Sequence, residues 1–467
     1  MAADLPSLDH LSPKDLYRAI REASAGAPVP IEVLSSPLQS MAPGEGTVLP
    51  RKELSPEEKK QLRKKNQEDM RRLNIAWLDQ MVHSKAQLRE KMALFWHGHF
   101  ASRSFDLYFQ QILLDKIRQH ALGNFGELLH EVSKTAAMIH FLNNNQNRKD
   151  HPNENFAREV MELFTLGRGH YTEQDVKEAA RCFTGWGANQ QGEFVFRKFQ
   201  HDSGEKTLLG KTGNFQGDDV LDILLSQKQT ARFMANKIYR FLVNDRLDES
   251  RAAWLGERFY QSRYDISQLL EDIFTSDWFY HPANIGARIK SPVELLAGLR
   301  RMLPMKIENE ESQILVQRVL GQLLFFPPNV AGWPGGTSWI DSSSLMFRLR
   351  IPQILYHSDE IQLQAKTDDD QMMGIRDMPL ERARVKGLGN MKKNAFIQVQ
   401  INWEEFQASF ARVPRESLTS ALSGTLLQVP SEIRASTLEK YSDSGSRENF
   451  IKTTAIQIMS TPEYQLC

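Results

Sequence analysis

Two glutamates, Glu159 and Glu162, have the residue type and spacing best suited to acid–base chemistry. They are three residues apart, so a helix would make them neighbours. An apolar stripe that includes Phe156 and Phe164 would lie beside them. Paired carboxylates next to an apolar face can bind a divalent metal or divide the roles of acid and base. We therefore predict that both glutamates are catalytic.

Polar and aromatic residues around these glutamates are suited to holding a substrate. The predicted substrate-binding residues are Asn153, Asn155, Arg158, Arg181, Lys206 and Trp186. The basic side chains among them would bind an anionic group. The structural alternative is that an asparagine caps the helix, Gly167 ends it, and Arg158 pairs with Glu154 four residues earlier. Arg181 would likewise pair with Glu178.

Histidines are concentrated in the N-terminal half, where eight of the 12 lie between His83 and His170. His97 and His99 are the candidate ligands of a divalent metal, the cofactor that these residues suggest. On a regular helix the two side chains diverge by about 200°, so they converge only if Gly98 breaks the helix. In the alternative interpretation Gly98 ends the helix and a histidine satisfies its last carbonyls.

The dipeptide His201–Asp202 is a second place where a base or a ligand pair could act, and we predict that both residues are catalytic. Ser203–Gly204 follows directly and is typical of a hairpin turn. The predicted hairpin pairs residues 194–196 with residues 207–209. The alternative is an ordinary polar turn without chemistry.

Helices must position most of these side chains, because helix-start signals recur along the chain. Ser55-Pro56 with Glu58 and Ser291-Pro292 with Glu294 are capping boxes with proline in the first turn. Further starts are predicted where a capping residue precedes a helical pattern, at Ser12, Ser84, Asn124, Thr172 and Asp265.

Strand patterns are sparse, so we predict a mainly α fold: a multi-helix globular domain with one small β-hairpin and a small C-terminal helical region. Residues 397–403 alternate with period two and are either a strand or an extended wrap. The predicted organisation is an irregular arm over 1–50, a main helical domain over 51–366, a mobile linker over 367–393 and a helical piece over 394–467 that packs on the main domain.

Composition excludes several classes of protein. The 467 residues carry 58 basic and 58 acidic side chains, so the chain is neutral, unlike a globally basic nucleic-acid binder. Nucleic-acid binding through the lysine-rich residues 59–72 therefore ranks last. Two cysteines cannot form a disulfide framework, and no apolar run is long enough to span a membrane. No signal peptide is visible, so a cytoplasmic location is the default expectation, with export as the alternative.

Several motifs resemble the bacterial family called domain of unknown function 1800. They are residues 95–100, 153–159, 162–167, 171–173, 184–186, 201–202 with Lys206, 329–333 and 461–465. The resemblance covers roughly residues 85–467, and the run 153–159 is its most specific part. It implies a helical bacterial protein without an established reaction. It also implies relatives that are often exported and accompanied by a sulfatase-like or phosphatase-like partner protein.

Two functions fit these observations. The first is an enzyme or ligand-binding protein with one His/Glu/Asp site in residues 95–206, for which metal-dependent hydrolysis is the least specific chemistry. The second is a non-catalytic scaffold whose polar residues form a buried network, with the loop around Trp333 and Trp339 docking a protein partner. An open cleft where the polar groups meet would favour the first. Polar groups that all have hydrogen-bond partners in a closed interior would favour the scaffold.

Overall fold

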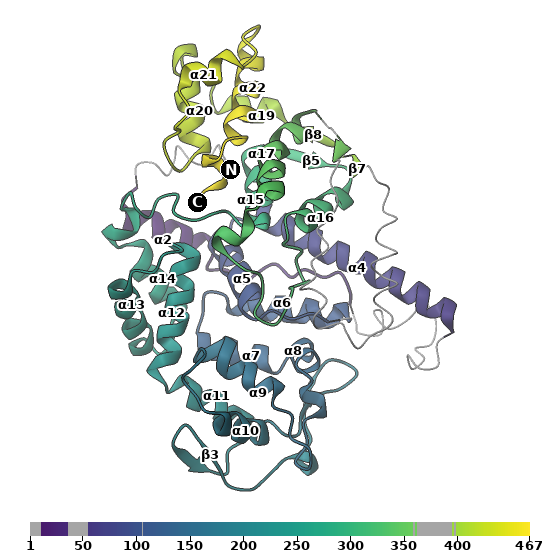
Figure 1. Ribbon diagram of the computed structural model, residues 1–467. Coiled ribbons are helices and arrows are strands. Elements are labelled where there is room, and N and C mark those ends of the chain that lie inside the picture. The colour runs from purple at the N-terminus through teal and green to yellow at the C-terminus, as the bar shows by residue number, and fades with distance from the viewer. Residues whose placement is uncertain (1–10, 36–54, 105, 358–359, 362–394, 397) are drawn as a thin grey trace.

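The computed structural model describes residues 11–35, 55–104, 106–357, 360–361, 395–396 and 398–467. The predicted mainly α class is confirmed, because helices dominate and the strands form only two-stranded sheets (Figure 1). The predicted linker over 367–393 and much of the predicted arm over 1–50 lie outside the described residues.

The helices of the N-terminal two thirds are α2 (Pro13–Ala23), α4 (Pro56–His83), α5 (Gln87–His99), α6 (Leu107–His120), α7 (Phe125–Ser133), α8 (Ala136–Phe141), α9 (Asn155–Glu159), α10 (Glu173–Cys182), α11 (Gly217–Leu225), α12 (Lys228–Leu242), α13 (Glu249–Gln261), α14 (Ile266–Phe274) and α15 (Pro292–Met302). They are followed by α16 (Glu310–Val319), α17 (Ser342–His357), α19 (Trp403–Ala408), α20 (Leu418–Leu426), α21 (Ala435–Lys440) and α22 (Arg447–Met459). Figure 1 shows α10, α11 and β3 at one end of the molecule and α20, α21 and α22 at the other.

Helix starts follow the capping signals closely. Ser55, Thr172 and Ser291 each begin a helix with a complete capping box. Asn124 caps α7 as predicted. These starts are local, since one side-chain oxygen satisfies a backbone N–H two or three residues later. Ser84 is a correction, because it ends α4 and its hydroxyl accepts from the N–H of Ala86 one residue before α5 begins.

The predicted hairpin pairing is wrong. The strands are β1 (Trp186–Ala188), β2 (Phe194–Phe196), β3 (Lys206–Leu208), β4 (Lys211–Gly213), β5 (Met305–Ile307), β6 (Glu360–Ile361), β7 (Ala395–Phe396) and β8 (Val399–Ile401). β2 pairs with β1 and β3 pairs with β4, so two separate hairpins replace the single one. The alternation over 397–403 does include a strand, since β8 pairs with β5 from the middle of the chain.

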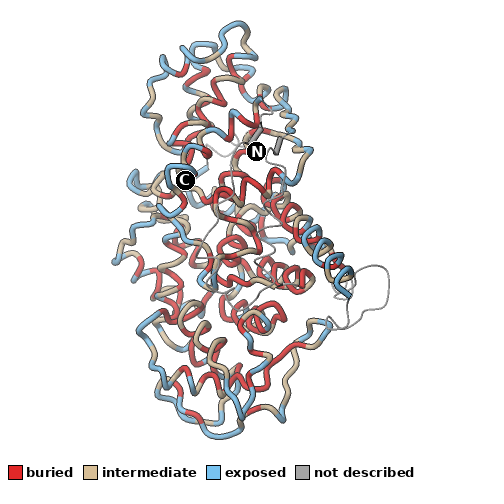
Figure 2. The backbone as a smooth tube through the Cα atoms, turned by 45° about the vertical axis from the view of Figure 1, so that its right-hand side comes forward, coloured by how far each residue is buried: buried red, intermediate tan, exposed pale blue. Residues whose placement is uncertain are grey.

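The core is continuous and strongly aromatic. Trp96, Phe100, Phe125 and Phe164 are fully buried and pack ring against ring between α5, α7 and the segment after α9. Figure 2 shows buried backbone running through the centre of the molecule, with exposed segments around it. The predicted site residues therefore lie on helices and loops that pack around an apolar core.

The C-terminal segment contacts the rest of the described chain at several places. β8 pairs with β5, α22 packs against α17, and Leu466 forms a β-bridge with Ile289. These contacts agree with the predicted packing of residues 394–467, while the division into domains stays a prediction.

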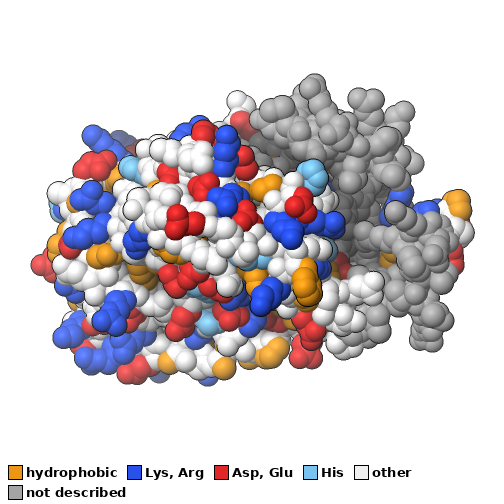
Figure 3. Space-filling view, turned by 90° about the horizontal axis from the view of Figure 1, so that it is seen from below, with side chains coloured by type: hydrophobic (Ala, Val, Ile, Leu, Met, Phe, Trp, Pro, Cys, Tyr) orange, Lys and Arg blue, Asp and Glu red, His pale blue; other side chains and the backbone are white. Residues whose placement is uncertain are grey.

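The lower end of the molecule in Figure 1 carries charges of both signs on its surface. The end formed by α10, α11 and β3 shows acidic and basic side chains interspersed across the visible face (Figure 3). Among the helices that the structure describes, none combines the length and apolar character that a membrane span requires.

Candidate functional site

The helix that carries the two glutamates changes its winding between them. After α9 the chain continues as a π-helical turn, Val160–Thr165, in which the N–H of Leu166 reaches back five residues to the carbonyl of Met161. The Thr165 hydroxyl donates to the Val160 carbonyl at 2.7 Å inside this turn. Such turns are rare and are enriched at functional sites. Gly167, with φ of 81°, follows the turn, and a side chain at this position would collide with Phe233 of α12.

The carboxylate of Glu162 already binds neighbouring side chains. Its carboxylate accepts from the Tyr171 hydroxyl at 2.5 Å and pairs with Arg168 at 2.8 Å. These contacts, the Tyr171 hydrogen bond first, lower the pKa of Glu162. The group is therefore an anion that ties the π-helical turn to the loop before α10.

Glu159 is the exception among the predicted carboxylates. The residue is half-buried, and its side chain makes no hydrogen bond or ion pair with any residue that the structure describes. Burial, with a contribution from the charge of Glu162, raises the pKa of Glu159. Its carboxyl group is thus free to accept or donate a proton.

The predicted asparagines act on the backbone. The Asn153 side chain accepts from the N–H of Asn155 at 3.0 Å, and the Asn155 side chain donates to the Leu142 carbonyl at 3.1 Å. Asn147 connects this segment to α10. Its side chain accepts from the N–H of Asn153 at 2.9 Å and donates to the Ala180 carbonyl at 2.9 Å. These bonds fasten the start of α9 to α10. Sequence reasoning missed Asn147, although the asparagine-rich run over 143–147 was a signal for it.

The two predicted arginines pair with carboxylates, as the structural alternative expected. Arg158 bridges Glu154 at 3.0 Å and Glu173 at 2.7 Å, and so links α9 to α10. Arg181 binds Glu178 at 2.8 Å and Asp202 at 2.7 Å.

His201 and Asp202 lie beside α10 but point into different environments. Asp202 accepts from Arg181 and from the N–H of Gly204, and the Arg181 contact is the main reason why its pKa is lowered. His201 is 8% exposed, and its Nδ1 donates to the Thr184 carbonyl at 2.9 Å. Burial lowers the pKa of His201, so the ring is neutral. Its Nε2 is buried without a hydrogen-bond partner.

Lys206 and Trp186 are interior residues. Lys206 is 1% exposed, and its ammonium donates to the carbonyls of Asp202 at 2.5 Å and Phe215 at 2.9 Å. Trp186 is 2% exposed and packs edge to face on Phe183. Neither side chain presents itself to an external ligand in this structure.

His97 and His99 do not converge. α5 runs through Gly98 to His99, so both the helix break that convergence required and the predicted helix end at Gly98 are wrong. Aromatic side chains pack on both sides of the end of α5 and keep its last turn helical. His99 Nε2 donates to the Phe164 carbonyl at 3.3 Å, and its Nδ1 accepts from the Lys237 ammonium at 2.9 Å. Burial holds the pKa of His99 well below its usual range.

His97 occupies a different pocket of the core. Its Nε2 accepts from the N–H of Phe325 at 3.2 Å, and its ring packs against Trp77 and Trp333. Burial lowers its pKa to about 3. Both histidines therefore use their one lone pair inside the protein, and a metal could bind either only after displacing that contact. Trp339 is buried as well, so it is not displayed for a partner.

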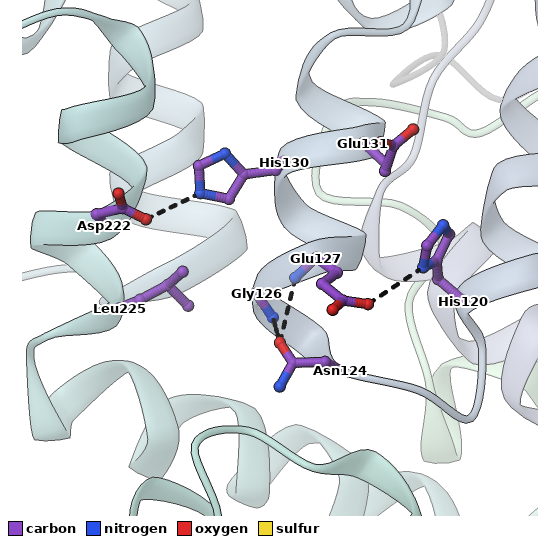
Figure 4. A pocket seen from close by; sticks show the side chains of 8 residues that line it. All are labelled: His120, Asn124, Gly126, Glu127, His130, Glu131, Asp222 and Leu225. Atoms are coloured by element: carbon purple, nitrogen blue, oxygen red, sulfur yellow. Dashed lines mark hydrogen bonds and ion pairs between the residues drawn. The ribbon is translucent and has the colours of Figure 1, made fainter.

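A cavity of about 450 Å³ opens elsewhere, between α6, α7 and α11 (Figure 4). His130 lines it and binds Asp222 through Nε2 at 3.1 Å and Asp218 through Nδ1 at 2.9 Å. Burial alone would lower the pKa of His130, but the two carboxylates outweigh it and raise the pKa. None of the predicted site residues lines this cavity.

The predicted residues thus form separate local networks rather than one centre. Within the described part of the chain, no group of three or more His, Cys, Asp or Glu side chains is arranged to hold a metal ion. Glu159 and the Nε2 atom of His201 are the predicted acid–base groups that keep unused capacity.

Comparison with known proteins identifies the family. The family model described as protein of unknown function, DUF1800, matches residues 5–466, and the chain therefore belongs to that family. None of the curated proteins and none of the solved structures gives a significant match.

Proposed function

We propose that this DUF1800 protein is a non-catalytic helical scaffold, in which the polar residues between 95 and 206 hold helices and loops in register. The observation that supports it is the separation of these residues into local networks that their own neighbours occupy. Glu162, Arg158, Arg181, Asp202 and Lys206 each contact protein groups within hydrogen-bonding distance.

The energetics of buried polar groups give such networks a structural purpose. A buried donor or acceptor that loses its partner costs about 1–3 kcal/mol. A fully satisfied network therefore disfavours every other packing of the same helices. The buried pair of Arg118 and Glu90, joined at 2.7 Å, follows the same pattern elsewhere in the molecule.

A double-mutant cycle on Arg181 and Asp202 tests the proposal. We expect Arg181→Met and Asp202→Asn each to lower the free energy of unfolding in urea, and the double variant to lose less than the sum. The coupling should be about 1–2 kcal/mol, as for contacting partners in one network. Additive losses would count against a structural role for this pair. Glu249→Gln, at an exposed position in α13, is the control.

A second candidate function is hydrolysis, including metal-dependent hydrolysis, with Glu159 and His201 as acid–base groups. It is favoured by the unpaired carboxylate of Glu159 and the free Nε2 of His201. Turnover of nitrophenyl esters or phosphates, with or without added Mn²⁺, that falls about 100-fold in Glu159→Gln would support it. Turnover that Glu159→Gln and His201→Gln leave unchanged would reject it. Elemental analysis of protein purified without added metal tests the metal.

The scaffold proposal includes a protein partner, for which the family resemblance suggests a sulfatase-like or phosphatase-like protein. Phe199 is 93% exposed and is a candidate anchor for it. Co-purification with such a protein from the same bacterium, reduced by Phe199→Ser, would support this part. Equal recovery with the variant would remove Phe199 from it. We also propose a cytoplasmic location, and cell fractionation that finds the protein outside the cytoplasm would overturn it.

A further inference from the structure

Trp254 of α13 is the most exposed tryptophan among the residues that the structure describes, at 44%. One face of its indole lies against Arg258, one helical turn later, with the guanidinium carbon 5.3 Å from the ring centroid. The Arg258 guanidinium is itself fixed by Asp272 of α14, through contacts of 2.5 Å and 2.7 Å. The indole is therefore supported on one face, and its exposed surface lies on the opposite face and the ring edge.

A cavity of about 340 Å³ opens beside Trp254, between α13 and the segment that follows α14. It is lined by Ser250, Arg251, Trp254, Ser276 and Trp278. Its volume is within the range of about 300–1,000 Å³ in which proteins bind small molecules. Trp278 forms a fixed second wall, because Tyr239 stacks on its ring at 6.1 Å and Arg251 lies over the ring at 5.3 Å.

The polar groups of the cavity are hydrogen-bonding groups without an unpaired charge. Neither indole N–H of the lining has a hydrogen-bond partner among the described residues. Arg251 is paired with Asp248 at 3.3 Å. The hydroxyls of Ser250 and Ser276 each donate to a protein oxygen, at 2.7 Å and 2.6 Å, so each can still accept. The lining thus offers both donors and acceptors to a neutral ligand.

These features disfavour charged ligands and purely apolar ligands. The arginines on the two indoles already use faces that attract positive charge and would repel a second cation. An anion would have to compete with Asp248 for Arg251. An apolar ligand would bury the indole N–H groups without partners, which is costly. A neutral ligand with several hydroxyl groups and one apolar face matches every part of the lining.

We propose that this cavity binds one sugar ring of the pyranose type, stacked on the exposed face of Trp254. The C–H groups on one face of a pyranose carry partial positive charge and are attracted to the negative face of an indole. Sugar hydroxyls donate and accept, so they can bind the indole N–H of Trp278, the Arg251 guanidinium and the serine hydroxyls. Because protein contacts already hold both indoles, binding orders few side chains.

The test is saturation-transfer NMR on the full chain with the methyl glycosides of glucose, galactose, mannose and N-acetylglucosamine. At least one glycoside should bind saturably, and transfer should be strongest to the C–H protons on one face of its ring, because that face lies on the indole. Choline and benzoate, measured in parallel, represent cationic and anionic ligands. No saturable binding of any of these glycosides would overturn the proposal, whether or not choline or benzoate binds.

Three variants assign the binding to the cavity. Trp254→Ala removes the stacking surface from an exposed position and should weaken glycoside binding at least about tenfold. Trp254→Phe keeps an aromatic face and should lose less. Tyr441→Ala removes another exposed aromatic ring, which follows α21 and is remote from α13 (Figure 1), and should bind as the unaltered chain does. Equal glycoside affinity in Trp254→Ala and the unaltered chain would contradict the assignment.

Discussion

At the scale of single residues, whether a side chain can act as an acid, a base or a ligand depends on whether neighbouring groups already bind its polar atoms. His99 and Glu162 have the residue types of a catalytic site, yet a lysine, a tyrosine and an arginine occupy their acid–base atoms. Glu159 has the same chemistry and no such partner. The sequence shows residue types but not occupancy, because the occupying groups come from positions such as Lys237, far along the chain.

Asn147 offers a direct test at this scale. It is 1% exposed, and its side-chain amide bonds the N–H of Asn153 and the carbonyl of Ala180. Asn147→Ala should lower the free energy of unfolding by about 2 kcal/mol, because both backbone groups lose a buried partner. Urea unfolding measures the change, and Gln190→Ala at an exposed turn is the control. A loss no larger than that of the control would contradict the assigned role.

Asp202 makes stability depend on pH in acid. The hydrogen bond from Arg181 is the main reason why its folded-state pKa lies below the ordinary 3.8. Its contribution is therefore complete above pH 3.8 and is lost as the pH falls through the lower folded value. The stability difference between the unaltered chain and Asp202→Asn should narrow as the pH falls below that point. A stability difference that stays constant in acid would show that the charge of the Asp202 carboxylate does not stabilise the folded chain.

At the scale of elements, the π-helical turn sets where its side chains point. Its extra residue per turn places the Phe164 carbonyl against His99 and carries the chain to Gly167 beside Phe233. A helical pattern with period 3.6 predicted the buried positions Phe156 and Phe164 correctly, but it contains no signal for a wider turn.

Thr165 is the residue whose replacement tests the turn. Its hydroxyl donates to the Val160 carbonyl inside the turn and is fully buried. Thr165→Val keeps the shape and removes the donor, so the free energy of unfolding should fall by about 1 kcal/mol. Thr212→Val, at an exposed position in β4, is the matched control. Equal stability of Thr165→Val and the unaltered chain would mean that the hydroxyl does not support the turn.

Helices α7 and α11 should separate more easily in alkali. His130 of α7 binds Asp218 and Asp222 of α11, and these carboxylates raise its pKa above the ordinary 6.5 despite burial. The stability it contributes is fully present below pH 6.5 and is lost as the pH rises through the raised value. Unfolding of the unaltered chain and of His130→Gln across this range measures it. A gap that widens in alkali would contradict the ion-pair account.

Elements were predictable where their signals are local. Ser55, Thr172 and Ser291 begin helices because each cap satisfies a backbone group two or three residues away. The partner of β2 was not predictable, since β1 and β3 both offer short extended segments nearby. Strand pairing and the meeting of side chains depend on packing between distant segments, and a single sequence does not encode either as a local pattern.

At the scale of the whole molecule, the polar groups are spread over one continuous core. The α9–α10 network, the His99–Lys237 contact and the Arg118–Glu90 pair each join different pairs of elements. The neutral composition agrees with this distribution, because acidic and basic side chains mostly pair with each other.

Replacing the predicted site residues one at a time by alanine tests the central claim most directly. The eight of them to be replaced are Asn153, Asn155, Arg158, Glu159, Glu162, Arg181, His201 and Asp202. A scaffold predicts a lower free energy of unfolding for all of these variants except Glu159→Ala, because each of the others loses native partners. Catalytic groups are held at a cost to stability, so their removal commonly leaves stability unchanged or raises it. Unchanged or higher stability across most of the set would contradict the scaffold account.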